Sequence, residues 1–385
     1  MKRYFSLMLA VLLLLLGACT QREYLSVKPH EEQYVEQENA DATVISDYEG
    51  LVSALLQQCS RHETNGLIRV YGYPGEIVED VPKAVYYVAK QSALGAYAVD
   101  YITYDCAQVV SYYEISVDIT FSRTMEQMQE LIATRGENAI RLRVSDALQS
   151  YAPTLALRVY STGVYDVAGF VREYYNENPG LLQVCPEVQI SFYPRNVAVE
   201  EYIMQIDFSY PYPEEELQRY QQEVNAVVDA AVEYVQHRES EEEKLMLLYV
   251  YLAERFNYEE KSTDTPVYSA LCQGQVNASA AARTMKTLCN AIGVDCWVVE
   301  GTYLDSPWYW NIVEVDGKYY HVDAMRCISA GQAVLNLDLD SGMSLYSWSR
   351  SDYPACTLRP DGGIDMREDA EENSGEFGEN LQPTP

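Results

Sequence analysis

Cysteine and histidine are the side chains with which this sequence could carry out nucleophilic or metal chemistry, and it contains nine cysteines and four histidines. A thiolate attacks a carbonyl carbon when a histidine takes its proton and an acidic group orients the imidazole. The histidines are scattered along the chain, however, and the cysteines form no Cys-x-x-Cys pair. This spacing gives little support to a zinc site, and no glycine-rich phosphate loop is present. We therefore expect neither a metal nor an organic cofactor.

The first residues indicate where the protein resides. Lys2 and Arg3 precede an apolar run that ends at Leu16, and Gly17, Ala18 and Cys19 follow. The run is too short to cross a bilayer, which takes about 20 apolar residues, and the arrangement is typical of an export signal.

The Leu-Gly-Ala-Cys ending resembles the bacterial lipobox. The resemblance implies a signal peptide at residues 1–18 and lipid attachment at Cys19, which would anchor the protein stably on the extracytoplasmic face of a bacterial cell membrane. Eight cysteines remain after Cys19. An even number outside the cytosol makes disulfide pairing possible without implying it.

The composition excludes several classes of protein. Hydrophobic residues make up 48% of the 385 residues, which predicts a globular body of two or three domains. Acidic residues outnumber basic ones 58 to 27, giving a net charge of −31. That charge repels phosphate backbones, so we expect no nucleic-acid partner.

Changes in composition and periodicity divide the chain into segments. After the signal peptide we expect a flexible acidic tether (19–46), a duplicated α+β domain (47–211), a helical linker (212–239), a second α+β domain (240–358) and an acidic disordered tail (359–385). Ser240 and Glu243 form a capping box that opens the second domain.

The first domain shows an internal repeat with the order αβαββ. In the first copy we predict helices at 48–59 and 82–94 and strands at 67–71, 97–104 and 112–121. In the second copy we predict helices at 125–134 and 164–174 and strands at 140–144, 187–192 and 201–208. The match is clearest between residues 115–122 and 203–209, at a spacing of about 87 residues.

The second domain contains a series of short landmarks. They are a helix headed by Glu241, the stretch 268–271 before Gly274, a helix through 282–294, strands at 296–302 and 310–315, a strand at 318–323, and the ending Tyr353-Pro354-Ala355-Cys356. Together they resemble the bacterial transglutaminase-like family. The resemblance implies a papain-like α+β fold with a Cys-His-Asp triad.

The resemblance also locates the triad positions. The nucleophilic cysteine belongs at the start of the helix, where the helix dipole stabilises a thiolate, and this chain has Ala278 there. The histidine position is occupied by Trp308, and only Asp323 matches. Alanine cannot attack and an indole cannot accept a proton at neutral pH, so we expect a catalytically degenerate member.

One alternative keeps an enzymatic activity. Cys272 lies six residues before Ala278, and His321 and Asp323 share a strand face because side chains alternate. A relocated set of Cys272, His321 and Asp323 would make the protein a cysteine-dependent acyl transferase or peptidase.

The degenerate site suggests a binding function in place of catalysis. Aromatic walls suit sugar faces and extended peptides, and the residues that we expect to line a groove are Trp297, Tyr303, Trp308, Tyr309 and Trp310. The sequence thus predicts a lipoprotein that binds a cell-wall polymer, a peptide or an envelope protein. A passive scaffold, in which the repeat domain binds the partner, is a further alternative.

Overall fold

The computed structural model describes residues 42–161, 163, 165–196, 200–258 and 263–357. The predicted signal peptide, Cys19, nearly all of the tether and the tail therefore lie outside the described residues. Within the described residues, no helix is both long enough and apolar enough to span a bilayer. The described residues from Val44 onward belong to one unit.

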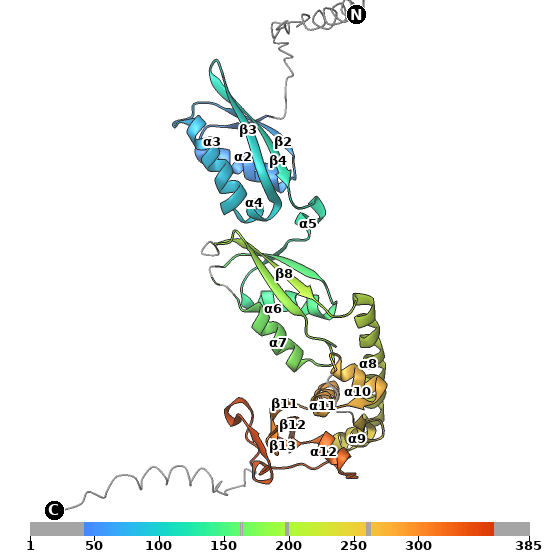
Figure 1. The fold of residues 1–385 in the computed structure, drawn as a ribbon. Helices are drawn as coiled ribbons and strands as arrows, with labels where there is room; N and C mark the ends of the chain where they lie inside the picture. The colour runs from blue at the N-terminus through green and yellow to red at the C-terminus, as the bar shows by residue number, and fades with distance from the viewer. Residues whose placement is uncertain (1–41, 162, 164, 197–199, 259–262, 358–385) are drawn as a thin grey trace, which may run out of the picture. The chain divides into compact units, whose positions relative to one another are not determined.

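The first copy of the repeat is a four-stranded sheet with helices on one face (Figure 1). Its elements are β1 (Thr43–Ile45), α2 (Tyr48–Ser60), β2 (Asn65–Val70), α3 (Ile77–Tyr86), the π-helical turn η1 (Tyr87–Gln91), α4 (Ala93–Ala98), β3 (Val99–Val109) and β4 (Tyr112–Phe121). Alternation in β4 buries Ile115, Val117 and Ile119 against the helices. The segment predicted as a helix at 82–94 spans the end of α3, all of η1 and the start of α4, and the break before α4 arises because Ser92 takes an extended conformation and caps that helix.

The second copy repeats this architecture. Its elements are α5 (Met125–Gln129), β5 (Ile132–Thr134), α6 (Glu137–Gln149), β6 (Thr154–Val159), α7 (Val167–Glu177), β7 (Glu187–Tyr193) and β8 (Tyr202–Ser209). The strand orders β1-β2-β4-β3 and β5-β6-β8-β7 are equivalent. The duplication and the α+β class are therefore as predicted, with one additional strand at the start of each copy.

Two elements of the second copy were predicted wrongly, and strand β6 was not predicted. The segment predicted as a strand at 140–144 lies inside α6, and the helix predicted at 125–134 is a short helix followed by β5. Ile140 and Val144 are both buried and stand four residues apart, a spacing that places them on one side of a helix. Their β-branched side chains favour a strand, but this preference is weaker than the packing that buries them in a helix.

The spacing of the repeat is 89 residues rather than about 87. Thr43, Tyr48 and Asn65 begin elements whose counterparts begin at Ile132, Glu137 and Thr154. Ile115 therefore corresponds to Met204, which is also fully buried, and not to Ile203. A shift of one residue in a strand moves every side chain to the other face, so the earlier alignment placed Ile203 on the wrong side of the sheet.

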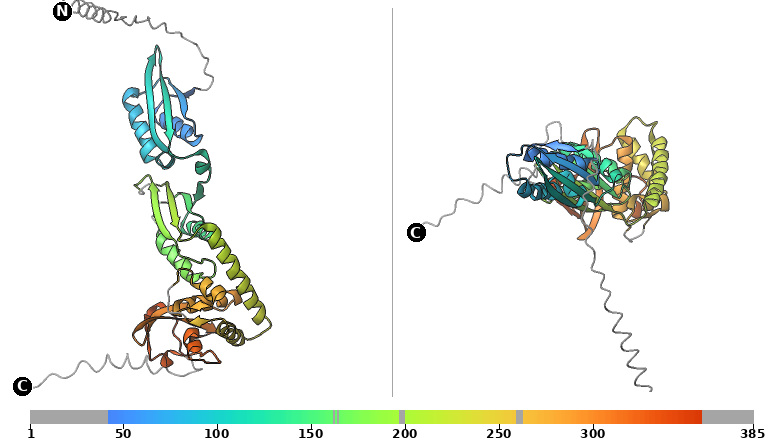
Figure 2. Two further views of the ribbon diagram at one scale, coloured as in Figure 1. Left: turned by 45° about the vertical axis from the view of Figure 1, so that its right-hand side comes forward. Right: turned by 90° about the horizontal axis from the view of Figure 1, so that it is seen from above.

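Helix α8 (Glu214–Val235) occupies the expected linker region. Its Leu217 packs in the core of the second copy, while Val224, Ala231 and Val235 pack in the core of the C-terminal domain. Figure 2 shows α8 beside α10, with which it is in contact. The helix is thus part of two hydrophobic cores.

The C-terminal domain combines helices with a four-stranded antiparallel sheet of order β13-β12-β11-β14. Its elements are α9 (Glu241–Ala253), β9 (Asn257–Tyr258), α10 (Pro266–Gln273), β10 (Gln275–Val276), α11 (Ala278–Ile292), β11 (Cys296–Tyr303), β12 (Ser306–Val315), β13 (Lys318–Val322), α12 (Ala324–Ser329), η2 (Asp340–Gly342), β14 (Tyr346–Trp348) and η3 (Arg350–Asp352). Ser240 caps α9 by accepting a hydrogen bond from the Glu243 N–H, which is one of the two bonds of the predicted capping box.

Candidate functional site

The two faces of the C-terminal sheet have different surroundings. The register pairs Val299 with Trp310 and Gly301 with Trp308, so these residues share one face, which we call the aromatic face. On the opposite face, Val313 packs in the same core as α11. The Asn311 amide donates a 2.9 Å hydrogen bond to the Ala282 carbonyl of α11 and ties the sheet to that helix.

Helix α11 begins at Ala278, the position of the expected nucleophile. The side chain of Asn277 caps the helix by accepting a 2.8 Å hydrogen bond from the Ala280 N–H. Ala278 is 7% exposed. Its methyl group offers neither a proton nor a lone pair, so the position of the expected nucleophile cannot supply one.

Asp323, which follows β13, is the centre of a buried hydrogen-bond cluster. Its Oδ2 accepts hydrogen bonds from Trp308 Nε1 at 2.7 Å and from the Tyr346 hydroxyl at 2.8 Å. Its Oδ1 accepts a 2.9 Å hydrogen bond from the Arg326 backbone N–H at the start of α12. Burial raises the pKa of Asp323, and these three donors partly oppose the rise because they stabilise the carboxylate.

Tyr346 and Arg326 complete this cluster, and sequence reasoning missed both. Tyr346 reaches Asp323 because β14 pairs with β11, which places Tyr346 opposite Tyr303. The guanidinium carbon of Arg326 lies 5.3 Å from the ring centroid of Tyr303 and 5.9 Å from that of Tyr346. The abundance of tyrosine was the only feature of the sequence that could have indicated this cluster around Asp323.

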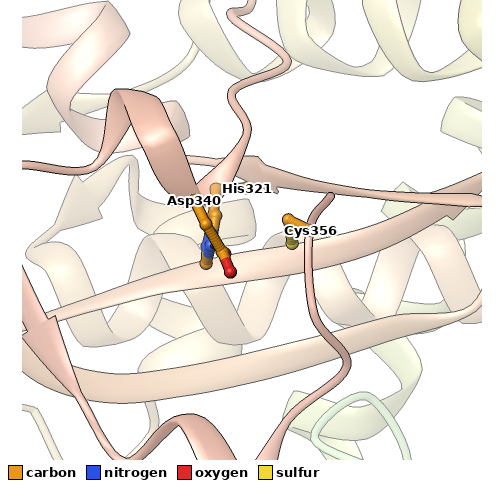
Figure 3. Close-up of side chains that lie close together, drawn as sticks. All are labelled: His321, Asp340 and Cys356. Carbon is orange, nitrogen blue, oxygen red and sulfur yellow. Dashed lines mark hydrogen bonds and ion pairs between the residues drawn. The ribbon is translucent and has the colours of Figure 1, made fainter. Parts of the chain in front are cut away.

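A second cluster brings together His321, Asp340 and Cys356 (Figure 3). Trp310 Nε1 donates to His321 Nδ1 at 3.0 Å, and His321 Nε2 lies 2.8 Å from Asp340 Oδ1. An indole N–H only donates, so Nδ1 is the unprotonated nitrogen and Nε2 donates to the carboxylate. Burial lowers the pKa of His321, which outweighs the opposite effect of Asp340.

Comparison with known proteins identifies the domain in which these clusters lie. Residues 228–332 match the model of the transglutaminase-like superfamily. The C-terminal domain is a transglutaminase-like domain. The match includes Ala278, Trp308 and Asp323, and with the observed sheet and helices it confirms the predicted α+β, papain-like fold class. No curated protein matches the sequence.

Solved structures show only distant similarity. A crystal structure described as a TGase is 11% identical, with a TM-score of 0.28, and the match covers 63% of this chain and 72% of that chain. A candidate cysteine protease from Cytophaga hutchinsonii is 12% identical, with a TM-score of 0.25 and coverage of 42% and 70%. A candidate protease from Parabacteroides distasonis is 9% identical, with a TM-score of 0.23 and coverage of 67% and 39%.

The cluster of His321, Asp340 and Cys356 has the residue types of a cation site. The position of the His321 ring proton, however, does not fit metal binding. The possible ligand atoms of His321, Asp340 and Cys356 lie within 4.8 Å of one another. A metal would need the lone pair of His321 Nε2, which requires the ring proton to move to Nδ1. There it would face the donating N–H of Trp310. The cluster is better suited to hold the sheet to the segment that contains Asp340.

The structure does not join Cys272, His321 and Asp323 into one hydrogen-bonded set. Cys272 is in α10, where burial and nearby Glu223 raise the pKa of its thiol to about 11. The ring nitrogens of His321 contact Trp310 and Asp340, and the oxygens of Asp323 accept from other donors. The predicted relocated triad is therefore not assembled.

The predicted groove residues do not line one surface. Trp310 is 1% exposed and belongs to the core, so its assignment as a ligand contact was wrong. Tyr309 lies on the opposite face from Trp308, with its hydroxyl 3.1 Å from Glu300 Oε1, so it cannot share a wall with Trp308. Trp297 is half-buried against Tyr319.

Tyr303 and Trp308 remain together on the aromatic face. They are half-buried, and their ring centroids lie 5.8 Å apart. The ring of Tyr346 stands 4.8 Å from that of Tyr303. These three side chains form the aromatic surface nearest to Asp323.

Proposed function

We propose that this chain is an exported lipoprotein, anchored through Cys19, whose transglutaminase-like domain binds a ligand without transforming it. The observation that carries the proposal is the 2.7 Å hydrogen bond from Trp308 Nε1 to Asp323. In a working triad that acceptor orients a histidine base. In this chain Asp323 instead accepts a hydrogen bond from an indole N–H, a group that donates hydrogen bonds and cannot accept a proton.

The remaining thiols support a non-catalytic role. Burial raises the pKa of Cys59 and Cys356 to about 12, and that of Cys272 to about 11. A thiol with such a pKa is protonated at neutral pH and is a poor nucleophile. None of these three groups is therefore poised for acyl transfer.

The proposed ligand is a cell-wall polymer, a peptide or an envelope protein, held near the membrane by the lipid. Tyr303, Trp308 and Tyr346 present half-buried aromatic rings, which suit sugar faces and extended peptides. The net charge of −31 argues against nucleic acid.

The binding proposal is tested by cosedimentation of the full-length protein, in detergent, with purified cell-wall fragments. We expect Tyr303→Ala to weaken binding about tenfold or more, while Tyr309→Ala, on the opposite sheet face, leaves it unchanged. Equal loss in both variants, or no binding by the native protein, would contradict the proposed surface. A release of ammonia from glutamine peptides that disappears with Cys272→Ala would contradict the non-catalytic role.

The anchoring proposal has a separate test. Cells fed a labelled fatty acid should incorporate label into the native protein and not into the Cys19→Ala variant. Label that persists in the variant would remove Cys19 as the attachment site.

A further inference from the structure

Two buried cysteines lie on either side of the turn that joins α11 to β11. Cys289 is in the last turn of α11 and is 0% exposed, while Cys296 is the first residue of β11 and is 4% exposed. The chain reverses between them at Gly293, which caps the helix with a φ of 76°. The Val294 N–H then bonds to the Cys289 carbonyl at 3.0 Å.

Hydrogen bonds fix which side of α11 faces Cys296. Asn311 Nδ2 contacts both the Ala282 carbonyl at 2.9 Å and Cys296 Sγ at 3.4 Å. Lys286 Nζ donates to the Cys296 carbonyl at 2.7 Å. Residues 282, 286 and 289 are spaced so that they lie on one side of the helix. The Cys289 side chain is therefore on the same side of α11 as the groups that contact Asn311 and Cys296.

The two thiols also interact with each other. The pKa of Cys289 is raised, and the neighbouring Cys296 thiol is the leading cause, followed by burial. Both side chains belong to the same hydrophobic core. In the structure they are free thiols, as are the other described cysteines.

We propose that Cys289 and Cys296 are a disulfide site, which closes when the chain folds in the presence of a disulfide donor. The thiolate of one cysteine attacks the donor's S–S bond and releases one donor thiol. The other cysteine then attacks the mixed disulfide and releases the second donor thiol. The cysteines lose two electrons in total, and the donor disulfide is reduced to two thiols.

The crosslink joins the end of the helix that begins at Ala278 to the first strand of the sheet. Because both sulfurs are buried in the folded protein, the donor reaches them only before the core has closed. Oxidation is thus a folding step, and the folded, reduced protein resists it.

The test starts from full-length protein, reduced in denaturant and refolded with a mixture of reduced and oxidised glutathione. Free thiols are then alkylated in denaturant, and peptides are mapped by mass spectrometry. We expect a peptide pair linked through Cys289 and Cys296 and two fewer alkylated thiols than in a sample kept in dithiothreitol. Cys59, which is also 0% exposed but lies in a different core, serves as the matched control and should be alkylated in both samples.

Full alkylation of both cysteines after refolding, or a link from either one to another cysteine, would overturn the proposal. A second measurement checks the consequence for stability. The linked protein should unfold about 5 to 10 °C above the Cys289→Ser variant refolded in the same way. Equal midpoints in the two proteins would mean that no link formed.

Discussion

The indole nitrogen of Trp308 donates a 2.7 Å hydrogen bond to Asp323, the one residue of the expected triad that this chain keeps. The carboxylate is 8% exposed and accepts two further hydrogen bonds. A buried carboxylate without donors is costly, so the bond explains how Asp323 persists where no histidine needs to be oriented. In the function that we propose, Trp308 takes the structural part of the histidine's role and not its proton transfer.

Removal of the Trp308 indole N–H should destabilise the C-terminal domain. Trp308→Phe keeps an aromatic ring but leaves Asp323 one hydrogen bond short, which we expect to cost about 1–3 kcal/mol of unfolding free energy. Trp308→His restores a ring N–H and should cost less. Urea denaturation followed by circular dichroism measures both. Trp297→Phe, in the neighbouring strand β11, is the control. A loss with Phe no larger than the control would show that the hydrogen bond contributes little.

The buried His321 predicts a loss of stability in mild acid. Its folded pKa is lowered from 6.5, so the unfolded chain takes up the proton more readily. The contribution to stability is therefore full above pH 6.5 and decreases as the pH falls below it. Asp340 and Asp338 favour the protonated imidazole, but burial, which acts in the same direction as Arg350, outweighs the two aspartates.

The measurement is the urea midpoint of the native protein and of His321→Gln between pH 7.5 and 5.5. We expect the native midpoint to fall more steeply with acidity than that of the variant. Asp323, with a raised pKa, changes stability in the opposite direction as the pH falls, and it is present in both proteins, so the difference between the two slopes reports the histidine. Parallel slopes would contradict the assignment.

Cys272 should react slowly with thiol reagents. A pKa of about 11 in place of 9.0 lowers the thiolate fraction at neutral pH roughly a hundredfold. Iodoacetamide labelling of the native protein from pH 5 to 9, followed by peptide mapping, measures this rate. A Cys272 that labels rapidly at pH 7, with an apparent pKa below 8.5, would instead favour the cysteine-dependent enzyme.

Gly301 in β11 should not tolerate a side chain. A Cβ there would lie 2.2 Å from the Ser347 carbonyl and 2.8 Å from the Trp310 ring. Gly301→Ala must displace strand β14 or a buried tryptophan, and we expect a loss of about 1–3 kcal/mol. Gly163→Ala, where the nearest atom is 3.9 Å away, is the control for thermal unfolding. Equal midpoints would show that β14 adjusts without cost.

The sequence predicted the repeated elements well where alternation was strong. Strand β4 matches the predicted 112–121 because Ile115, Val117 and Ile119 alternate with polar residues. The prediction failed at Ile140 and Val144, whose spacing fits one face of a helix although both residues favour strands. Local preference and tertiary packing disagree there, and packing decides.

The site was predictable only in part for a similar reason. Motif spacing located Ala278, Trp308 and Asp323, which lie at the start of α11, in β12 and directly after β13. Tyr346 could not be connected with Asp323, because its position depends on β14 returning to pair with β11. The alternation that separates Tyr309 from Trp308 was visible in the sequence, but the start of the strand was not.

Each of the duplicated sheets carries an Arg–Glu pair, Arg69 with Glu114 and Arg158 with Glu201, although at the 89-residue spacing only the two arginines correspond. Asp118 and Asp207 likewise accept hydrogen bonds from Asn65 and Thr154 on the paired strands. A strand of one copy could therefore satisfy the polar face of the other while the chain folds, a known hazard of tandem repeats. The feature that distinguishes correct from incorrect strand pairing is then the packing of the buried faces. There, Ile68 and Ile115 of the first copy are replaced by Leu157 and Met204 in the second. We expect the divergence of these core side chains to protect each copy from exchanging strands with the other.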